Sequence, residues 1–169
     1  MIKIVLVKVD ENNDIKNVSL KLKKKYVGDY QINEYGKPIS DRCFFNISHS
    51  KDVVVFTSNK DTPVGIDIEK VRPVDQKVVD YTCSNIEKAY IKSNKQYFEI
   101  WTNKEAIVKC EGTGFQGVVK TIPALPLNSV KSLDGEIFTT KTIDYKDYVI
   151  TVCLKGDFDF EIELVEETI

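Results

Sequence analysis

At 169 residues the chain is long enough for one ordinary domain, or for two small halves that share a core. Apolar residues make up 42% of it and charged residues 30%, a balance that excludes disordered and fibrous proteins. The net charge of −2 argues against a general nucleic-acid-binding protein, although it leaves room for a local basic cluster.

The sequence shows no pattern typical of a membrane span, a secretory signal, a disulfide framework or a zinc site. The longest apolar runs, such as residues 4–7 and 53–56, fall far below the roughly 20 residues that span a bilayer, so we expect no membrane contact. The N-terminus lacks the cationic start and small-residue cleavage site of a secretory signal, which favours a cytoplasmic protein. Four scattered cysteines match neither a disulfide framework nor a zinc site, and we interpret them as reduced core thiols.

The first half of the chain reads mainly as strands. Residues 1–9 are rich in β-branched side chains and predict a strand, and the apolar period from Ile15 to Tyr26 predicts a short helix. Three further strand-like segments follow at residues 43–47, 53–57 and 64–68, separated by polar turns. We expect these three to form a small antiparallel sheet.

Helical character returns between about residues 73 and 90, and more strongly between 95 and 111, where Gly112 and Gly114 provide a stop. Strands are expected near residues 137–143, 148–154 and 158–165. The mixture predicts an α+β fold. The Lys-Asp-Val-Val-Val sequence of residues 51–55 resembles the Lys-Asp-Tyr-Val-Ile of residues 146–150, which suggests two related halves, although chance could produce the echo.

Two carboxylates project from one side of the strand at residues 64–69. Residues two apart share a face of a strand, so Asp67 and Glu69 point one way while Ile66 and Ile68 point the other. The alternative is an edge strand with a solvated acidic face. Asp-x-Glu alone does not decide between these interpretations.

A third carboxylate lies on the predicted helix near Trp101. Phe98, Trp101, Glu105 and Val108 form one stripe, and an ionised glutamate among apolar neighbours is costly unless it is paired or bound to a metal. An ion pair with Lys109, four residues on, is the alternative.

If that helix packs on the sheet, the three carboxylates converge, and oxygen ligands suit Mg²⁺ or Mn²⁺. A single histidine and unpaired cysteines argue against zinc.

Several residues could contact phosphate. Residues 46–50, Asn-Ile-Ser-His-Ser, are interpreted as a polar loop at a sheet end, where hydroxyl and N–H groups can bind anions. Lys37, Lys104 and Lys109 could bring cations to the same cleft, although each of them taken singly reads more simply as a surface lysine. The cluster of Lys21 and residues 23–25 reads as a solvated helix face or as a second phosphate patch.

Four segments in this order resemble the surfactin-synthetase-activating type of 4′-phosphopantetheinyl transferase. They are Gly-Lys-Pro at 36–38, Phe-Asn-Ile-Ser-His-Ser at 45–50, Gly-Ile-Asp-Ile-Glu at 65–69, and Trp-Thr-x-Lys-Glu-Ala-x-x-Lys-x-x-Gly-x-Gly at 101–114. The resemblance implies two pseudo-symmetric halves, each a small antiparallel sheet with a packed helix. We place them at residues 1–70 and 71–169, with the Asp-x-Glu strand in the first and the Trp-x-x-Lys-Glu helix in the second.

The resemblance also implies an enzyme that moves the 4′-phosphopantetheine group of coenzyme A onto a serine of an apo acyl or peptidyl carrier protein, releasing 3′,5′-adenosine bisphosphate. It assigns Mg²⁺, or Mn²⁺, to Asp67, Glu69 and Glu105, with Glu105 as general base. Lys109 and Lys104 would steady the diphosphate.

It further assigns the nucleotide end to Lys37, Ser48 and His49, and the carrier contact to residues 71–90. The stretch before Gly36 is shorter than in typical members, so the basic cluster at 21–25 or a partner subunit would supply the remaining phosphate contacts. We expect a pseudo-dimeric monomer. The alternative function is a non-catalytic module that binds coenzyme A or a nucleotide.

Overall fold

The computed structural model describes residues 1–114 and 116–169. Its strands and helices come mostly in separate runs, with mainly antiparallel pairing, and the α+β class predicted from the sequence is confirmed. The strands are β1 (Ile2–Lys8), β2 (Gln31–Ile32), β3 (Pro38–Ile39), β4 (Phe44–Ser50), β5 (Val53–Asn59), β6 (Val64–Lys70), β7 (Val130–Leu133), β8 (Glu136–Tyr145), β9 (Tyr148–Lys155) and β10 (Ile162–Glu167). The helices are α1 (Ile15–Tyr26), α2 (Gln76–Thr82), α3 (Asn85–Tyr90), α4 (Asn94–Glu111) and the short 3₁₀ helix η1 (Val119–Thr121).

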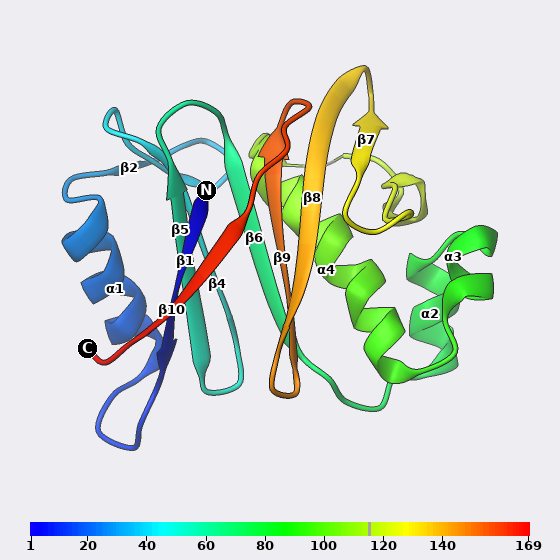
Figure 1. The fold of residues 1–169 in the computed structure, drawn as a ribbon, viewed down its shortest axis with the longest axis horizontal. Coiled ribbons are helices and arrows are strands. Elements are labelled where there is room, and N and C mark those ends of the chain that lie inside the picture. Colours follow the sequence, from blue (N-terminus) through cyan, green and yellow to red (C-terminus); the bar gives the residue numbers. More distant parts are fainter. Residues whose placement is uncertain (115) are drawn as a thin grey trace.

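Two four-stranded sheets form the centre of the molecule, with strand orders β10-β1-β5-β4 and β6-β9-β8-β7. Figure 1 shows α1 beside the first sheet at the left of the view, and α4 along the second sheet, running from the centre toward the right. One face of each sheet contributes to a shared apolar core, in which Ile4 of β1 and Val55 of β5 join Ile66 of β6 and Val152 of β9. Because these side chains are almost fully removed from water, the shared core binds the two sheets into one body.

The two halves repeat one topology. In the first, β1 pairs antiparallel with β5 and β5 with β4, and in the second, β6 pairs with β9 and β9 with β8. Each half therefore has the plan strand, helix, hairpin, with α1 and α4 as the respective helices. The registers agree as well, because Lys8 of β1 and Lys70 of β6 each face the first residue of the hairpin's second strand.

The Lys-Asp echo of the sequence lies at equivalent turns. Lys51 and Lys146 each begin a two-residue turn with positive φ, at 53° and 52°. Asp52 pairs with Lys8 at 3.8 Å, and Asp147 pairs with Lys70 at 3.2 Å. Backbone hydrogen bonds repeat too, since the Asp52 and Asp147 carbonyls accept from the residues that follow β1 and β6. The echo therefore marks a structural repeat.

Two expectations from the sequence are corrected. The strands of residues 43–47, 53–57 and 64–68 do not share a sheet, because β6 pairs with β9 and lies in the second sheet. The helical stretch after residue 73 is two helices, because Ser84 caps the N-terminus of α3 and forms a capping box with Glu87. β10, the last strand, completes the first sheet by pairing parallel with β1. The division of the chain at residue 70 stays a prediction, but the strand that carries Asp67 and Glu69 lies in the second sheet, and β10 lies in the first.

Among the residues that the structure describes, no helix is both long and apolar enough to cross a bilayer. All four cysteines are free thiols, and three of them are buried, at positions 83, 110 and 153. This agrees with their interpretation as reduced core residues.

Lys131 of β7 is a buried cation, and no carboxylate in the described part of the chain pairs with it. It is 5% exposed and donates to the Thr140 hydroxyl at 2.7 Å and to the Ser129 carbonyl oxygen at 3.3 Å. Burial lowers the pKa of Lys131 to about 8, from 10.5. Below pH 8 the lysine is charged in both the folded and the unfolded chain. The full cost of burying the charge then lowers the free energy of unfolding.

We therefore expect Lys131→Met to raise the free energy of unfolding at pH 7 by up to about 3 kcal/mol. That advantage should shrink as the pH rises from about 8 to 10.5, because the folded chain then loses the proton before the unfolded chain does. Urea denaturation at a series of pH values measures the difference, with the exposed Lys60→Met as control. A difference that does not change with pH would contradict the expectation.

Candidate active site

The Asp-x-Glu carboxylates lie where β6 faces α4. Ile66 and Ile68 point into the shared core, so Asp67 and Glu69 project from the opposite side of the strand, as the period of two predicts. Gly65 makes this contact close: a Cβ atom at this position would lie 2.1 Å from the carbonyl oxygen of Ala106 in α4. The helix therefore lies directly against the strand that carries the two carboxylates.

Asp67 is almost fully buried and binds only through one oxygen. Its Oδ1 accepts from the Lys109 ammonium at 2.6 Å and from the Ser48 hydroxyl at 2.9 Å. Its Oδ2 is buried and has no hydrogen-bond partner among residues 1–114 and 116–169, which is unusual for a carboxylate oxygen. Burial raises the pKa of Asp67, and the Lys109 ammonium opposes that rise. The site thus contains a shielded carboxylate oxygen that is free to accept a ligand.

Glu69, two residues on, is held in the same manner. Its Oε2 accepts from the Ser50 hydroxyl at 3.1 Å and from the Arg72 guanidinium at 2.8 Å. The glutamate is only half-buried, so its carboxylate reaches the rim of the site.

Glu105 completes the acidic set from α4. It is half-buried, and burial raises its pKa, with a further rise from the neighbouring Asp67 charge that Lys109 partly offsets. Lys109 makes its ion pair with Asp67, 2.6 Å away, so the alternative in which Glu105 is simply paired with Lys109 receives no support. Within residues 1–114 and 116–169, no three acidic, histidine or cysteine side chains are already close enough together to hold a metal.

The prediction of a polar loop at residues 46–50 is wrong, because these residues are the body of β4. Asn46, Ser48 and Ser50 lie on one face of that strand and contact β6 by side chains. The Asn46 amide oxygen accepts from the Ile66 N–H at 2.9 Å, in addition to the two serine contacts with the carboxylates. The alternation of polar and apolar residues was the sequence signal for a strand here.

The structure separates His49 and Lys37 from the carboxylates. His49 is exposed on the face of β4 opposite Ser48. The Lys37 ammonium donates to the carbonyl oxygen of Lys109 at 2.6 Å and of Cys110 at 3.3 Å, at the C-terminal end of α4. Burial lowers the pKa of Lys37. This lysine donates to carbonyl oxygens at the end of α4 that have no partner within the helix. Its positive charge also lies at the negative end of the helix dipole, so its role is structural.

The structure contradicts the prediction that Lys104 contacts the diphosphate. Its side chain is 1% exposed, and its ammonium is enclosed by the Glu87 carboxylate at 2.9 Å and by the carbonyl oxygens of Ile122 and Val119 at 2.7 and 3.1 Å. Lys104 and Lys109 are five residues apart, which places them about 140° apart around a helix. Only Lys109 faces β6.

Removing Lys104 should therefore affect folding rather than the site. We expect Lys104→Met to lower the free energy of unfolding by about 3 kcal/mol, because Glu87 would be left buried and unpaired. The double variant Lys104→Met with Glu87→Gln should recover part of that loss, because glutamine removes the buried charge and keeps an amide oxygen for the Ser84 N–H. Chemical denaturation of the single and double variants measures this, and an unchanged stability in the single variant would refute the ion-pair assignment.

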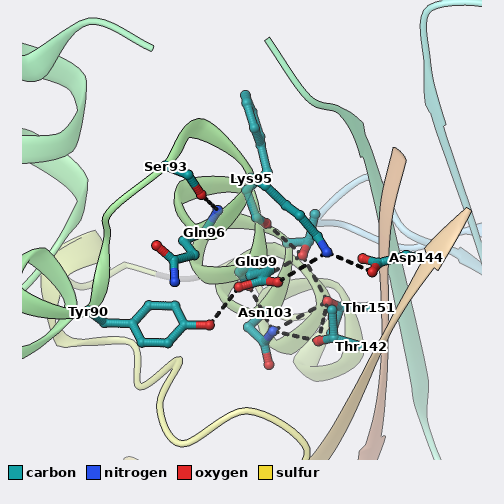
Figure 2. Close-up of polar contacts among 11 residues, drawn as sticks. Tyr90, Ser93, Lys95, Gln96, Glu99, Asn103, Thr142, Asp144 and Thr151 are labelled. Atoms are coloured by element: carbon teal, nitrogen blue, oxygen red, sulfur yellow. Dashed lines mark hydrogen bonds and ion pairs between the residues drawn. The ribbon is translucent and has the colours of Figure 1, made fainter. Parts of the chain in front are cut away.

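A network of hydrogen bonds holds the N-terminal half of α4 against the second sheet. Figure 2 shows Asn103 directed at Thr142 and Thr151, and Tyr90 and Lys95 approaching the Glu99 carboxylate. The Asn103 amide donates to the Thr142 hydroxyl at 2.9 Å, and the Tyr90 hydroxyl donates to Glu99 at 2.6 Å. Because these contacts lie on the helix that carries Glu105 and Lys109, they help fix where those two side chains stand.

Two hollows flank the carboxylates. A cavity of about 330 Å³ is lined by Glu69, Arg72 and Trp101, with residues of α2 at its outer wall. A second, of about 240 Å³, is lined by Lys109 together with residues 35–38 and the end of α4. The first cavity thus has one of the three carboxylates in its wall, and the second has the lysine that pairs with Asp67.

The basic cluster of α1 lies elsewhere. Lys25 pairs with Glu167 of β10 at 2.6 Å, and the Lys23 ammonium lies 4.9 Å from the ring centre of Tyr30. Neither lysine contacts a residue of the site, so the structure favours a solvated helix face.

Sequence reasoning missed Arg72, and it counted Asn46 and Ser50 only as members of an anion-binding loop, without their contacts to β6. The period-two pattern of β4 could have indicated the two β4 residues, because Asn46 and Ser50 share a face with Ser48. Nothing local in the sequence indicates that Arg72 turns back to Glu69.

Comparison with known proteins identifies the family. The model of the 4′-phosphopantetheinyl transferase superfamily matches residues 63–153, which include both β6 carboxylates and all of α4. The 4′-phosphopantetheinyl transferase gsp of Aneurinibacillus migulanus is 36% identical over 124 residues, covering 69% of this chain and 47% of that protein. The 4′-phosphopantetheinyl transferase Sfp of Bacillus subtilis is 32% identical over 109 residues, covering 59% and 45%.

This chain spans about half the length of these relatives. Among solved structures, the holo-[acyl-carrier-protein] synthase of Thermotoga maritima superimposes with a TM-score of 0.42 at 16% identity, covering 57% of this chain and 64% of that one. The family match spans more than half of this chain and contains the acidic residues that the structure brings to the β6–α4 contact. The chain belongs to the 4′-phosphopantetheinyl transferase superfamily.

Proposed function

We propose that the chain transfers the 4′-phosphopantetheine group of coenzyme A to a serine of an apo acyl or peptidyl carrier protein. The observation that carries the proposal is the arrangement at β6: a buried carboxylate with one free oxygen, an ammonium beside it, and two nearby hollows, one lined by Glu69 and the other by Lys109. A diphosphate donor in one hollow and an acceptor hydroxyl in the other would meet at these residues. The family relationship supports this choice of substrates.

Asp67, Glu69 and Glu105 would hold a divalent cation, Mg²⁺ or Mn²⁺. The residues fit such an ion in two respects: they provide only hard oxygen donors, and the buried Asp67 Oδ2 lacks a partner that an ion could supply. When bound, the cation would offset the negative charge that carboxylates and diphosphate bring together.

Glu105 is the proposed general base. Burial and the Asp67 charge raise the pKa of Glu105, which makes its free carboxylate a stronger base, and a bound cation would oppose that rise. In the proposed reaction the serine oxygen forms a bond to the β-phosphorus, the bond from that phosphorus to the bridging oxygen breaks, and 3′,5′-adenosine bisphosphate leaves. The serine proton goes to Glu105, and Lys109 steadies the diphosphate charge.

The nucleotide end of coenzyme A is proposed to enter the cavity beside Lys109, whose wall includes Lys37 and Pro38. Ser48, already bonded to Asp67 and Lys109, would be the nearest hydroxyl to the diphosphate. The His49 side chain is exposed on the face of β4 opposite Ser48. A contact between His49 and the nucleotide therefore stays a prediction. Lys104 has no part in the proposed site.

The carrier protein is proposed to approach over α2 and α3. Tyr81 and Ile86 are each 76% exposed there, and Val78 is exposed beside the cavity that contains Glu69. Exposed apolar side chains next to a reactive site are typical of a surface that binds another protein. We further propose that the chain works in the cytoplasm as a monomer whose two halves play the parts of two subunits.

The direct test is the intact mass of an apo carrier protein after incubation with this chain, coenzyme A and Mg²⁺. A gain of one phosphopantetheine group that EDTA abolishes would establish the transfer and its need for a metal. If several acyl and peptidyl carriers gain no mass while coenzyme A still binds, the chain is a binding module rather than an enzyme.

A further inference from the structure

Two serines of β4 each donate a hydrogen bond to one of the two β6 carboxylates. Ser48 and Ser50 are two residues apart and therefore share a face of the strand. The Ser48 hydroxyl donates to Asp67 Oδ1 at 2.9 Å, and the Ser50 hydroxyl donates to Glu69 Oε2 at 3.1 Å. Both serines are 7% exposed. The spacing of two in β4 thus matches the spacing of two in β6.

In each pair, a positively charged side chain contacts the same carboxylate oxygen that accepts from the serine. Lys109 lies 2.6 Å from Asp67 Oδ1, and Arg72 lies 2.8 Å from Glu69 Oε2. Every hydrogen bond that the described part of the chain makes to these two carboxylates falls on Oδ1 and Oε2. One oxygen of each carboxylate is fully used, and the other is left for a ligand.

The Ser50 hydroxyl is oriented before any ligand arrives. Its oxygen accepts from the backbone N–H of Lys70 at 3.0 Å, and its hydrogen is therefore directed away from that group and toward Glu69. Glu69 is only half-buried, so packing alone restrains its side chain less than it restrains Asp67. A fixed hydroxyl is the means by which β4 can hold this longer and more exposed carboxylate in one rotamer.

We propose that Ser50 is a positioning residue that turns Glu69 so that Oε1 faces the metal. It does for Glu69 what Ser48 does for Asp67, and neither serine needs to touch the metal. The inference rests on the proposed function, because it concerns how the proposed metal ligands are held. Groups that orient a ligating side chain commonly change metal affinity by 10–100-fold when they are removed.

The test is Ser50→Ala, with Mn²⁺ as the probe ion. We expect the dissociation constant for Mn²⁺, measured from the electron paramagnetic resonance of the free ion, to rise by about tenfold or more. In the transfer assay the Mg²⁺ concentration at half-maximal rate should rise in parallel, while kcat at saturating Mg²⁺ changes far less. Ser50→Thr keeps the hydroxyl on a β-branched side chain suited to a strand and should restore the affinity.

The matched control is Thr57→Val on β5. Its hydroxyl is also buried and donates to the Lys3 carbonyl oxygen of β1 at 2.9 Å, so its hydrogen bond lies within the first sheet rather than on a β6 carboxylate. A purely structural effect would lower thermal stability in both variants and leave Mn²⁺ affinity unchanged in both. If Ser50→Ala binds Mn²⁺ as the parent does, or if Thr57→Val weakens it equally, the inference fails.

Asp67→Asn separates that failure from a failure of the proposed function. If Asp67→Asn abolishes Mn²⁺ binding while Ser50→Ala leaves it intact, the metal site stands and only the role of Ser50 is refuted. If Asp67→Asn also leaves Mn²⁺ binding intact, the proposed metal site is itself wrong.

Discussion

Asp67→Asn should reduce the rate of phosphopantetheine transfer by about 10³-fold while the chain still folds. Asparagine keeps an oxygen that can accept from Ser48 and Lys109, so the contacts of Oδ1 can survive. It removes the negative charge and replaces the buried, unpartnered Oδ2 with an amide nitrogen, which is a hydrogen-bond donor and a poor metal ligand. The initial rate of carrier mass gain at saturating coenzyme A measures the effect.

The control for this variant is Asp61→Asn, which makes the same change of charge at an exposed aspartate in the turn between β5 and β6. It should leave the transfer rate unchanged. Circular dichroism and thermal unfolding would verify that Asp67→Asn is folded. A folded Asp67→Asn variant that retains a tenth or more of the parent rate would contradict the place of Asp67 in the reaction.

Gly65→Ala should have the largest effect on stability, with a loss of more than about 4 kcal/mol in the free energy of unfolding. The added Cβ would lie 2.1 Å from the Ala106 carbonyl oxygen and 2.5 Å from the Cys110 amide nitrogen. Both are backbone atoms of α4, so no side chain can move aside to relieve the contact. The helix would have to move away from β6. Chemical denaturation measures the loss.

The same movement should also impair the site. Lys109 and Asp67 are 2.6 Å apart across the contact that Gly65 permits, so a displaced α4 would lengthen or break that ion pair. Under conditions where the variant is still folded, transfer should be slower than in the parent.

Gly135→Ala is the matched control for the glycine substitution. Gly135 has a positive φ of 81° but nothing within 4 Å of an added Cβ, so alanine there costs only the backbone strain, about 1 kcal/mol. If Gly65→Ala lowers the free energy of unfolding no more than Gly135→Ala does, α4 can move away from β6 at little cost. The close contact at Gly65 would then not contribute to stability.

The sequence alone determined which side chains share a face within one element. The period of two placed Asp67 and Glu69 on the same side of β6, and the helical period placed Glu105 on a half-buried stripe of α4 with Trp101. Such patterns depend only on backbone geometry and on the burial of apolar residues, and both are local properties. The α+β class and the repeat marked by the two Lys-Asp turns were predictable for the same reason.

Only the tertiary structure decided which elements meet. Lys104 and Lys109 are both lysines of α4, yet one is enclosed against Glu87 and the other reaches Asp67, because different faces of the helix meet different neighbours. β6 pairs with β9, some 80 residues later in the chain, rather than extending the sheet of β5. The contacts of Ser50 and Arg72 with Glu69 depend on that placement. Non-local pairing is selected by the burial of whole faces at once, and no local period records it.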